Sequence, residues 1–466
     1  MNAFIKLPAI AVGTIAACAV LGVVALAAIN LQDEVLSPGA IARLTLDPVR
    51  TDPAVNGIFA TVGLGAEDPV AYGRRWAEAA TVRDATERRE RLAALGQPTL
   101  ELPEVAQCPE LDGRGCLGRH LADPAAAREI AAAGRSLAAQ YRRLRAYAVF
   151  EEIPASLDAV IASPAYGRLL RAQAVVFAEV ALAATSGDTD RAVAELAAEI
   201  AVHRRLLAGS RTLVTKMIMR RAVQRDLQAL VELAAFRPAA LGARARAPLG
   251  AVLVPLTEAE RTMEAAFWHE FRVAASLYQG VGQRALSGME LTDVPTVEWW
   301  WQLRRFAYLP NATVNRDFEL REPIGAALRA APAQLAGELA AAAASSEERA
   351  AALAASLAPH NLVGNRLAPR VFFEGTEYAL AVQDLDGLLR LVRSALLVAR
   401  ASGSPDKIPA ALAGAGALAA DPYTGKPLEW DADTKSVWFN PQSQRGAREQ
   451  VGPTPGRWTV AVPAAR

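Results

Sequence analysis

The chain has 466 residues, of which 52% are hydrophobic and 21% are charged, and its formal net charge at pH 7 is +1. A chain of this length has room for two or three domains. The balanced charge excludes the strong basic field with which many proteins attract nucleic-acid phosphates, so we expect no nucleic-acid partner. Much of the hydrophobic fraction is alanine, the best helix former, which predicts a mainly α-helical protein.

The N-terminal segment is apolar over residues 7–29 and carries no charged side chain there. At about 1.5 Å per residue, a helix of this length crosses the roughly 30 Å hydrocarbon layer of a bilayer. We expect an uncleaved signal anchor, a transmembrane helix, because the run exceeds the usual apolar region of a cleaved signal. Two alternatives remain open: a secretory signal cleaved near Ala25–Ala27, and a lipoprotein signal ending at Cys18.

The charges that flank this segment predict the side of the membrane that the chain occupies. Lys6 precedes the apolar run, whereas Asp33 and Glu34 follow it. Under the positive-inside rule the N-terminus stays in the cytoplasm and residues 31–466 lie outside it. The sequence therefore predicts a single-pass protein of a bacterial inner membrane with the bulk of its chain in the periplasm.

Helical periodicity extends through most of the remaining chain, with Pro, Gly and Asp-Pro at the ends of the periodic segments. Short breaks between these segments predict antiparallel neighbouring helices. His203 lies in an apolar stripe, where a hydrogen-bonded core histidine is favoured over a metal ligand. The predicted helices cover residues 67–95, 123–149, 163–186, 189–208, 212–235, 257–280, 296–308, 332–357 and 375–402, and residues 236–256 are predicted to be a connection.

Two cysteines, Cys108 and Cys116, flank a polar, turn-rich loop of seven residues. We expect them to form a structural disulfide, which suits an oxidising compartment such as the periplasm. Their spacing does not match the CxxC pattern of redox and zinc motifs. A metal or redox pair and two unpaired thiols remain the alternatives.

The densest aromatic patch consists of Trp299, Trp300 and Trp301, and Arg304 and Arg305 follow it. Three consecutive side chains cannot all face one core, so we expect at least one tryptophan to be exposed. Exposed aromatic side chains with arginines at the rim are typical of protein interfaces and of the membrane–water interface. The patch is therefore a candidate partner surface, and a core with a lid between helices is the alternative.

The character of the chain changes after Gly403, where prolines and glycines become frequent. Residues 428–431 and 436–440 are predicted to form a β-hairpin, and residues 457–462 could add a third strand. The expected architecture is a membrane anchor over residues 1–31, an α-helical periplasmic body over residues 32–358, and a C-terminal helix with a small β tail over residues 359–466.

The order of elements in this tail resembles that of type II secretion pseudopilins. In those proteins a long helix is followed by a DPxxGxP turn and a β-hairpin, and here Asp421, Pro422, Gly425 and Pro427 carry the match. The N-terminal apolar helix is also similar to theirs. However, pseudopilins carry a glutamate five residues after the glycine at which they are cleaved, and Cys18 stands at that position here. The resemblance therefore implies a shared tail architecture.

A second resemblance concerns the segments Pro310–Asn315 and Asn361–Asn365, together with the DPYTGKPL stretch of the tail. These segments resemble parts of uncharacterised, single-span envelope proteins of proteobacteria. The resemblance implies placement in the cell envelope and implies no particular chemistry.

The motifs of common catalytic and metal sites are absent from the sequence. No histidine lies in HExxH or HxH spacing, and no GxSxG elbow occurs. The adjacent pairs Glu151–Glu152 and Glu347–Glu348 would point about 100° apart on a helix and form no dyad. A pair of carboxylates from distant segments remains open.

These observations lead to an expectation about function. We expect a membrane-anchored scaffold or accessory protein that binds other envelope proteins, with no catalytic residue, cofactor or metal ion. A membrane-tethered periplasmic hydrolase acting on cell-wall glycan or peptide is the first alternative. A helical module that binds a small ligand is the second.

Overall fold

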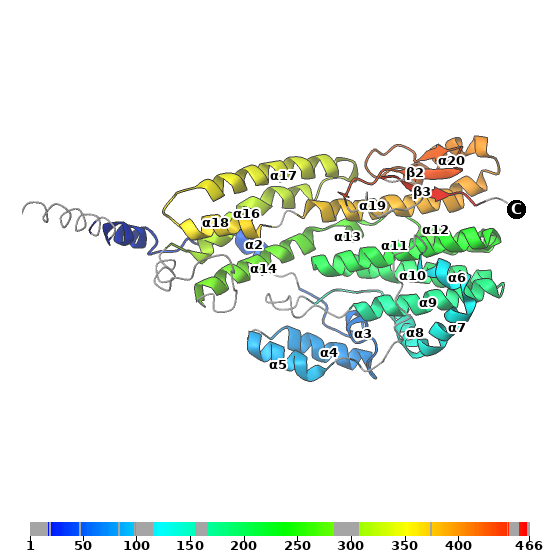
Figure 1. Ribbon diagram of the computed structural model, residues 1–466, viewed down its shortest axis with the longest axis horizontal. Coiled ribbons are helices and arrows are strands. Elements are labelled where there is room, and N and C mark those ends of the chain that lie inside the picture. Colours follow the sequence, from blue (N-terminus) through cyan, green and yellow to red (C-terminus); the bar gives the residue numbers. More distant parts are fainter. Residues whose placement is uncertain are drawn as a thin grey trace, which may run out of the picture. The chain divides into compact units, whose positions relative to one another are not determined.

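A computed structural model of the chain describes residues 17, 20–45, 48–82, 84–96, 98, 115–153, 166–283, 307–372, 375–444, 446 and 456–463 (Figure 1). Over these residues the protein is mainly helical, and a three-stranded antiparallel sheet lies near the C-terminus. Both features are as the sequence predicts. Among the described residues, no helix is both long enough and apolar enough to cross a membrane. The predicted anchor begins at residue 7, so its first part lies outside the described ranges.

The chain divides into two compact units that each gather distant segments of sequence. Unit 1 contains Met1–Asp47, Glu270–Ala327 and Ala340–Glu374, and unit 2 contains Pro48–His269, Leu328–Leu339 and Gly375–Arg466. This division differs from the expected boundaries near residues 31 and 358. The expected boundaries were placed where the composition of the sequence changes. The units instead reflect which segments, often distant in sequence, pack against one another.

Unit 1 is built around two helices that the sequence analysis missed, α16 (Pro310–Ala327) and α18 (Leu362–Val371), which contact each other. Each contains an internal proline, Pro323 and Pro369 respectively, and a proline normally interrupts a helical pattern. The short helix α2 (Pro38–Leu44) packs on α16. The close approach needs a glycine, because a Cβ at Gly39 would lie 2.5 Å from the Phe318 ring.

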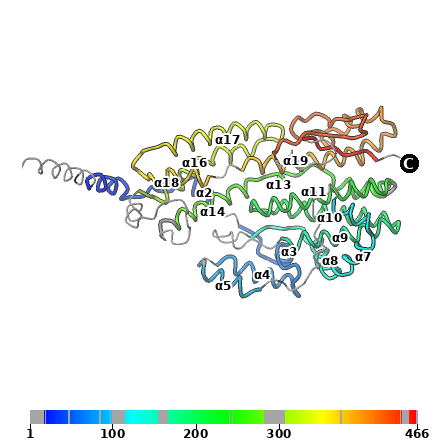
Figure 2. Tube along the Cα trace, in the orientation of Figure 1, coloured from blue at the N-terminus to red at the C-terminus, as the bar shows by residue number. Residues whose placement is uncertain are grey.

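Unit 2 is a bundle in which α10 (Thr189–Gly209) packs between α9 (Gly167–Thr185) and α11 (Leu213–Phe236). Figures 1 and 2 both show these helices side by side. Their facing sides are filled by buried Ala, Val and Leu side chains, as the predicted apolar stripes require. The other helices of this part are α3 (Ile58–Val62), α4 (Pro69–Ala80), α5 (Ala85–Leu95), α6 (Cys116–Ala122), α7 (Pro124–Ala133), α8 (Arg135–Arg142), α12 (Ala243–Val252) and α13 (Glu258–Arg261), with 3₁₀ turns at Arg143–Ala146 and Pro238–Leu241.

Helix α14 (Glu264–Gln283) has residues in both units, and so does α17 (Pro332–Ala355). Helix α17 follows its predicted range closely. Within the predicted 257–280 segment, α13 and α14 are separate helices. The break between them at residues 262–263 ends the capping-box turn that begins at Thr257.

Several other predicted helices are interrupted in the structure. The 67–95 segment ends its first helix at Ala80 and starts a second at Ala85, because the Asp84 side chain caps the new N-terminus. The 123–149 segment breaks at Gly134, where a Cβ would lie 2.4 Å from the Val175 side chain on α9. The predicted connection over residues 236–256 was wrong, since it contains α12.

The C-terminal part begins with α19 (Thr376–Arg393), which continues into one π-helical segment at Ser394–Ala399. It then passes through 3₁₀ turns at Pro405–Lys407 and Gly416–Ala419 and the helix α20 (Ile408–Gly414). Strands β1 (Glu429–Asp431), β2 (Ser436–Phe439) and β3 (Trp458–Ala461) pair in that order, with Val437 opposite both Trp430 and Val460. The predicted hairpin and third strand are therefore confirmed.

The sheet packs on α19 through aromatic side chains. The Phe439 and Trp458 rings are buried and meet edge to face, with centroids 5.5 Å apart. A Cβ at Gly387 on α19 would lie 2.4 Å from the Phe439 ring, so the glycine makes room for it. This contact fixes the small sheet against the last long helix of unit 2.

Candidate functional site

Some of the candidate site residues that the sequence analysis proposes lie outside the residues that the structure describes. This applies to Trp299, Trp300, Trp301, Arg304 and Arg305 of the aromatic patch, and to Cys108. The partner surface and the disulfide therefore stay predictions.

Two other candidates are placed by the structure. Cys116 is the first residue of α6, is buried, and has its Sγ 3.6 Å from His120 Nε2. In the tail turn, Asp421 Oδ1 accepts hydrogen bonds from the backbone N–H groups of Tyr423 and Thr424. Gly425 adopts φ +68° there, a left-handed conformation that favours glycine. Pro422 and Pro427 flank the same turn.

Within the part of the chain that the structure describes, a group of interacting titratable side chains lies inside unit 2. It joins Tyr141 on α8, Glu199 and His203 on α10, and Asp226 on α11, all between 0% and 1% exposed. His203 Nδ1 lies 2.6 Å from Asp226 Oδ2, and His203 Nε2 lies 2.9 Å from the Tyr141 hydroxyl. The same hydroxyl lies 2.6 Å from Glu199 Oε2. We call these four side chains the buried network.

Two further side chains complete the network. Arg145 Nη2 donates to Glu199 Oε1 at 2.9 Å, and Gln173 Nε2 donates to Asp226 Oδ1 at 2.7 Å. A buried carboxylate is costly unless it is paired and hydrogen-bonded, so these donors are what allows the two acids to lie in the core. Sequence reasoning expected a satisfied core histidine at position 203, and the structure confirms it.

Burial shapes the proton equilibria of the network. Burial raises the pKa of Glu199 above its ordinary value, and it also raises the pKa of Tyr141 well above the usual range. For His203, burial disfavours the imidazolium, but the hydrogen-bonded Asp226 carboxylate outweighs this effect and raises the pKa. Both His203 and Glu199 therefore hold a proton more strongly than they would in water.

The hydrogen bonds of the network require one proton more than its neutral imidazole and phenol supply. Three contacts link the four side chains, and each needs one proton. A neutral imidazole and the phenol supply only two. The third proton is carried by His203 or by one of the two carboxylic acids; on His203 it leaves Tyr141 donating to Glu199, and on Glu199 it leaves Tyr141 donating to His203. The network thus shares one proton and titrates as a unit.

The network also contains a set of donor atoms that could hold a metal ion, from Glu199, His203 and Asp226, all within 4.8 Å of one another. The geometry fits a shared proton better. His203 Nδ1 and Asp226 Oδ2 are 2.6 Å apart, whereas two ligands about 2.0 Å from a tetrahedral zinc ion are separated by roughly 3.3 Å. Both histidine nitrogens are already hydrogen-bonded. We therefore regard the network as structural.

A second buried charge lies near the C-terminal end of α10. Lys216 on α11 is 1% exposed, and its Nζ donates to the carbonyl oxygens of Leu207 at 3.0 Å and Ala259 at 3.4 Å. Burial lowers the pKa of Lys216 to about 7, against the opposing attraction of Glu260. Glu260 itself is paired with Arg204 at 2.6 Å. Among the described residues, this lysine is held by carbonyl oxygens and forms no ion pair with a carboxylate.

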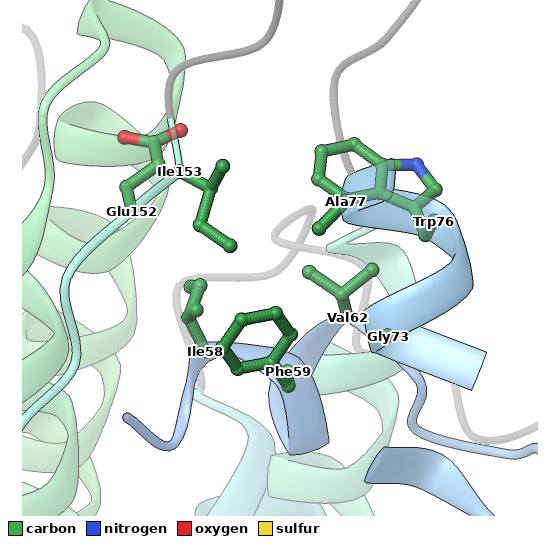
Figure 3. A pocket seen from close by; sticks show the side chains of 8 residues that line it. All are labelled: Ile58, Phe59, Val62, Gly73, Trp76, Ala77, Glu152 and Ile153. Atoms are coloured by element: carbon green, nitrogen blue, oxygen red, sulfur yellow. The ribbon is translucent and has the colours of Figure 1, made fainter. Parts of the chain in front are cut away.

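A small pocket lies between α3, α4 and residues 152–153 (Figure 3). Its lining is apolar apart from Glu152, and it has room for about one water molecule, far less than a drug-sized ligand needs. In Figure 3 the Glu152 carboxylate points away from Phe59 and Val62. The remaining lining residues are Ile58, Gly73, Trp76, Ala77 and Ile153.

The Glu152 carboxylate is occupied by the start of α11. Its Oε2 accepts from the backbone N–H groups of Arg211 at 2.7 Å and Thr212 at 2.8 Å, and its Oε1 accepts from the hydroxyls of Thr212 and Thr215. A carboxylate at a helix N-terminus satisfies N–H groups that have no partner within the helix. Glu152 therefore holds α11 in place, and the pocket itself is an apolar hollow.

The third feature is the junction between the N-terminal apolar segment and unit 1. Residues 20–29 are helical, and the Asn30 side chain closes this helix by donating to the Leu26 carbonyl at 2.9 Å. The same amide donates to the Pro359 carbonyl at 2.9 Å, and its oxygen accepts from the Asn361 N–H at 2.7 Å. The end of the apolar helix is thus bonded directly to the turn before α18.

The next residues bind to α16. Asp33 accepts from the N–H groups of Asn311 and Ala312, at the first turn of α16. Glu34 accepts from Asn315 at 3.0 Å and pairs with Arg316 at 2.8 Å. We call Asn30, Asp33 and Glu34, with these partners, the junction clamp. Sequence reasoning used Asp33 and Glu34 only as flanking charges, and no local signal pointed to partners about 280 residues away.

Comparison of the chain with protein-family models, curated proteins and solved structures finds no match. The resemblances of the tail and of the envelope-protein segments therefore stay predictions, and function is argued from the residues.

Proposed function

We propose that this protein is a membrane-anchored scaffold or accessory protein of the bacterial cell envelope, with its body on the periplasmic side of the inner membrane. The observation that carries the proposal is the helix over residues 20–29, which has no charged residue and exposes Val20, Leu21 and Val24. Exposed apolar side chains gathered on one element indicate an apolar environment such as lipid. The residues before it, back to residue 7, are equally uncharged.

The junction clamp supports the same proposal. A segment that is only an address signal needs no fixed attachment to the folded body, and a cleaved signal is lost from it. Here the residue that ends the apolar helix, Asn30, is buried and bonded to unit 1. The acids that follow it, Asp33 and Glu34, are bonded to α16. Cleavage near Ala25–Ala27 would remove the Leu26 carbonyl to which the Asn30 side chain donates.

The non-catalytic part of the proposal rests on the buried network. Within the described ranges, Glu199, His203 and Asp226 are the group that most resembles a catalytic or metal centre. Every one of these side chains is fully buried and hydrogen-bonded to protein partners. A general acid or base must come within hydrogen-bond reach of its substrate, and side chains that are 0% exposed offer a substrate in solution no such contact. Their arrangement supports a structural role.

The anchor is tested by placing charges in the apolar helix. We expect Val20→Asp combined with Val24→Asp to move the full-length protein from the carbonate-resistant membrane fraction to the soluble fraction, since each charge costs about 2.5–3.5 kcal/mol near the centre of a span. The control replaces two exposed apolar residues of unit 2, Val55→Asp with Phe236→Asp, and should stay in the membrane fraction.

The mass of the mature wild-type protein separates the anchor from its alternatives. An intact N-terminus supports the anchor. A mature chain that begins near residue 28 would show that the signal is cleaved and would contradict the anchor. A mature chain that begins at a lipid-modified Cys18 would contradict the anchor as well. Protease added to spheroplasts should degrade the body, because it is expected on the periplasmic side.

The scaffold role is tested by crosslinking in cells, followed by purification of the full-length protein and identification of what is bound. We expect specific envelope proteins to be recovered, and we expect Trp299→Ala with Trp301→Ala to lose them. The matched control is Trp438→Ala, a half-buried tryptophan of the tail sheet. Release of glycan or peptide fragments from purified cell wall would instead support the hydrolase.

A further inference from the structure

Three apolar side chains of unit 1 are more exposed than any other large apolar side chain that the structure describes. Leu31 is 81% exposed, Val35 is 87% exposed and Leu357 is 79% exposed. Singly exposed apolar residues are ordinary on protein surfaces, but a group of them at one place marks an interaction site. We call these three residues the junction collar.

All three collar residues lie within a few residues of the hydrogen bonds that join the end of the apolar helix to the rest of unit 1. Leu31 directly follows Asn30, which closes that helix. Leu357 lies two residues before Pro359, whose carbonyl accepts the Asn30 amide. The Val35 carbonyl accepts a hydrogen bond from the Asn315 side chain, which also binds Glu34 in the junction clamp.

The acidic residues between the collar positions are turned toward unit 1. Asp33 accepts two backbone N–H groups at the first turn of α16, where the helix dipole favours a negative charge. Glu34 is paired with Arg316 and hydrogen-bonded by Asn315. Their charge is thus compensated locally, and the residues left facing outward are the apolar ones.

We propose that the junction collar enters the headgroup region of the bilayer, so that this end of unit 1 lies on the membrane surface. The proposal rests on the anchor proposed above. If the span ends near Ile29, Leu31 follows two residues later and lies at most about 7 Å beyond it, within the roughly 5–8 Å of headgroup region on each side. The clamp keeps Leu357 near the same end of the helix, because it bonds Pro359, two residues further on, to Asn30.

The occupant is lipid because the collar is continuous with a helix that already requires an apolar medium. A flexible Gly/Ser linker would let the body drift from the surface, whereas this junction is fixed by several hydrogen bonds that are buried or partly buried. The partner recognised here is therefore the bilayer interface itself. A protein that covers the collar is the competing occupant, and the experiment distinguishes the two.

The experiment places a photoactivatable diazirine amino acid at one position of the full-length protein in vesicles of phosphatidylethanolamine and phosphatidylglycerol. The collar positions tested are Leu31 and Leu357. Val24 reports on the anchor, and Val55, an exposed apolar residue of unit 2, is the matched control. We expect phospholipid adducts at positions 24, 31 and 357 at least tenfold above those at position 55.

Each other outcome has a defined meaning. Adducts at position 24 without adducts at positions 31 and 357 would overturn the collar and leave the anchor standing. No adducts at position 24 would overturn the anchor and, with it, the collar. If the same labels in cells crosslink positions 31 and 357 to a protein in place of lipid, the collar is a protein interface and the lipid proposal is wrong.

Discussion

At the scale of single residues, the four side chains of the buried network are held by one another and by Arg145 and Gln173. Tyr141 bridges Glu199 and His203 through one hydroxyl, and this hydroxyl lets a single proton be shared between them. Polar groups buried in this way stabilise a fold only when all of them are satisfied. Tyr141 therefore stabilises the network through its hydroxyl oxygen, and a phenylalanine ring at the same position could not make these hydrogen bonds.

The first prediction concerns this oxygen. We expect Tyr141→Phe to lower the free energy of unfolding by about 1–3 kcal/mol, because it leaves Glu199 and His203 Nε2 buried without their shared partner. Urea unfolding measured by circular dichroism provides the check. The matched control is Tyr147→Phe, whose ring packs on Phe150 outside the network, and it should change stability by less than about 0.5 kcal/mol.

The second prediction concerns the pH dependence caused by Lys216. Its pKa is about 7 in the folded protein, against about 10.4 for an exposed lysine. The unfolded chain therefore binds more protons between these values, so the lysine costs stability most at pH 7 and below. This cost falls as the pH rises toward 10.4. The sign is opposite to that of His203, whose raised pKa gives stability that is lost as the pH rises.

Replacing the lysine isolates its contribution. We expect Lys216→Met to raise the free energy of unfolding by about 2–4 kcal/mol at pH 7, after allowing for its lost hydrogen bonds, and by much less at pH 10. The exposed Lys407→Met serves as the control and should give a difference that does not change with pH. A gain for Lys216→Met that is equal at both pH values would contradict the assignment.

At the scale of elements, α19 organises the C-terminal part of unit 2. Its Asp384 carboxylate accepts hydrogen bonds from the Tyr423 hydroxyl and from the N–H groups of Gln442 and Ser443. Asp386, one turn earlier than Arg390, pairs with it at 2.6 Å, and Arg390 also donates to the carbonyl of Ala420. The helix thus holds both the turn before the sheet and the segment after β2.

The third prediction follows from this arrangement. We expect Asp384→Ala to release the tail, because the two N–H groups and the hydroxyls that it binds lose their acceptor together. Limited proteolysis should then cut after β2 at least tenfold faster, while circular dichroism of the helices changes little. Asp406→Ala, an exposed aspartate of the same region, should behave as the wild type. Equal cleavage of both variants would show that Asp384 does not hold the tail.

At the scale of the whole molecule, the proposed placement of the body in an oxidising compartment has a covalent consequence. The predicted disulfide joins Cys108 and Cys116 across a short loop. In the chain-entropy model, closing such a loop stabilises the fold by about 2–3 kcal/mol. A disulfide between Cys108 and Cys116 would therefore support the periplasmic placement, and reduced thiols would weigh against it.

The fourth prediction tests both. We expect protein purified from the envelope to show no alkylation of Cys108 and Cys116 unless it is first reduced, and reduction should lower its unfolding free energy by about 2–3 kcal/mol. Cys108→Ser with Cys116→Ser is the control, whose stability should not respond to reductant. Full alkylation of both thiols without reduction would contradict the disulfide.

The sequence by itself determined the features that depend on neighbours along the chain. The periodic segments of α9, α10, α11, α17 and α19 were predicted nearly to their ends, because an apolar stripe and its caps lie within a few residues of one another. The hairpin of β1 and β2 followed from its own turn. The same local reasoning missed α16 and α18, where packing tolerates internal prolines.

Only the tertiary structure decided which distant residues meet. Tyr141 reaches Glu199 across 58 positions, and Asn361 reaches Asn30 across 331. A polar residue within an apolar stripe shows that a partner is needed, but the partner is set by which helices pack together. The junction depends on tertiary packing in the same way. In the sequence, Asp33 and Glu34 look like ordinary flanking charges, and only the fold brings α16 and the turn before α18 into hydrogen-bond contact with residues 30–34.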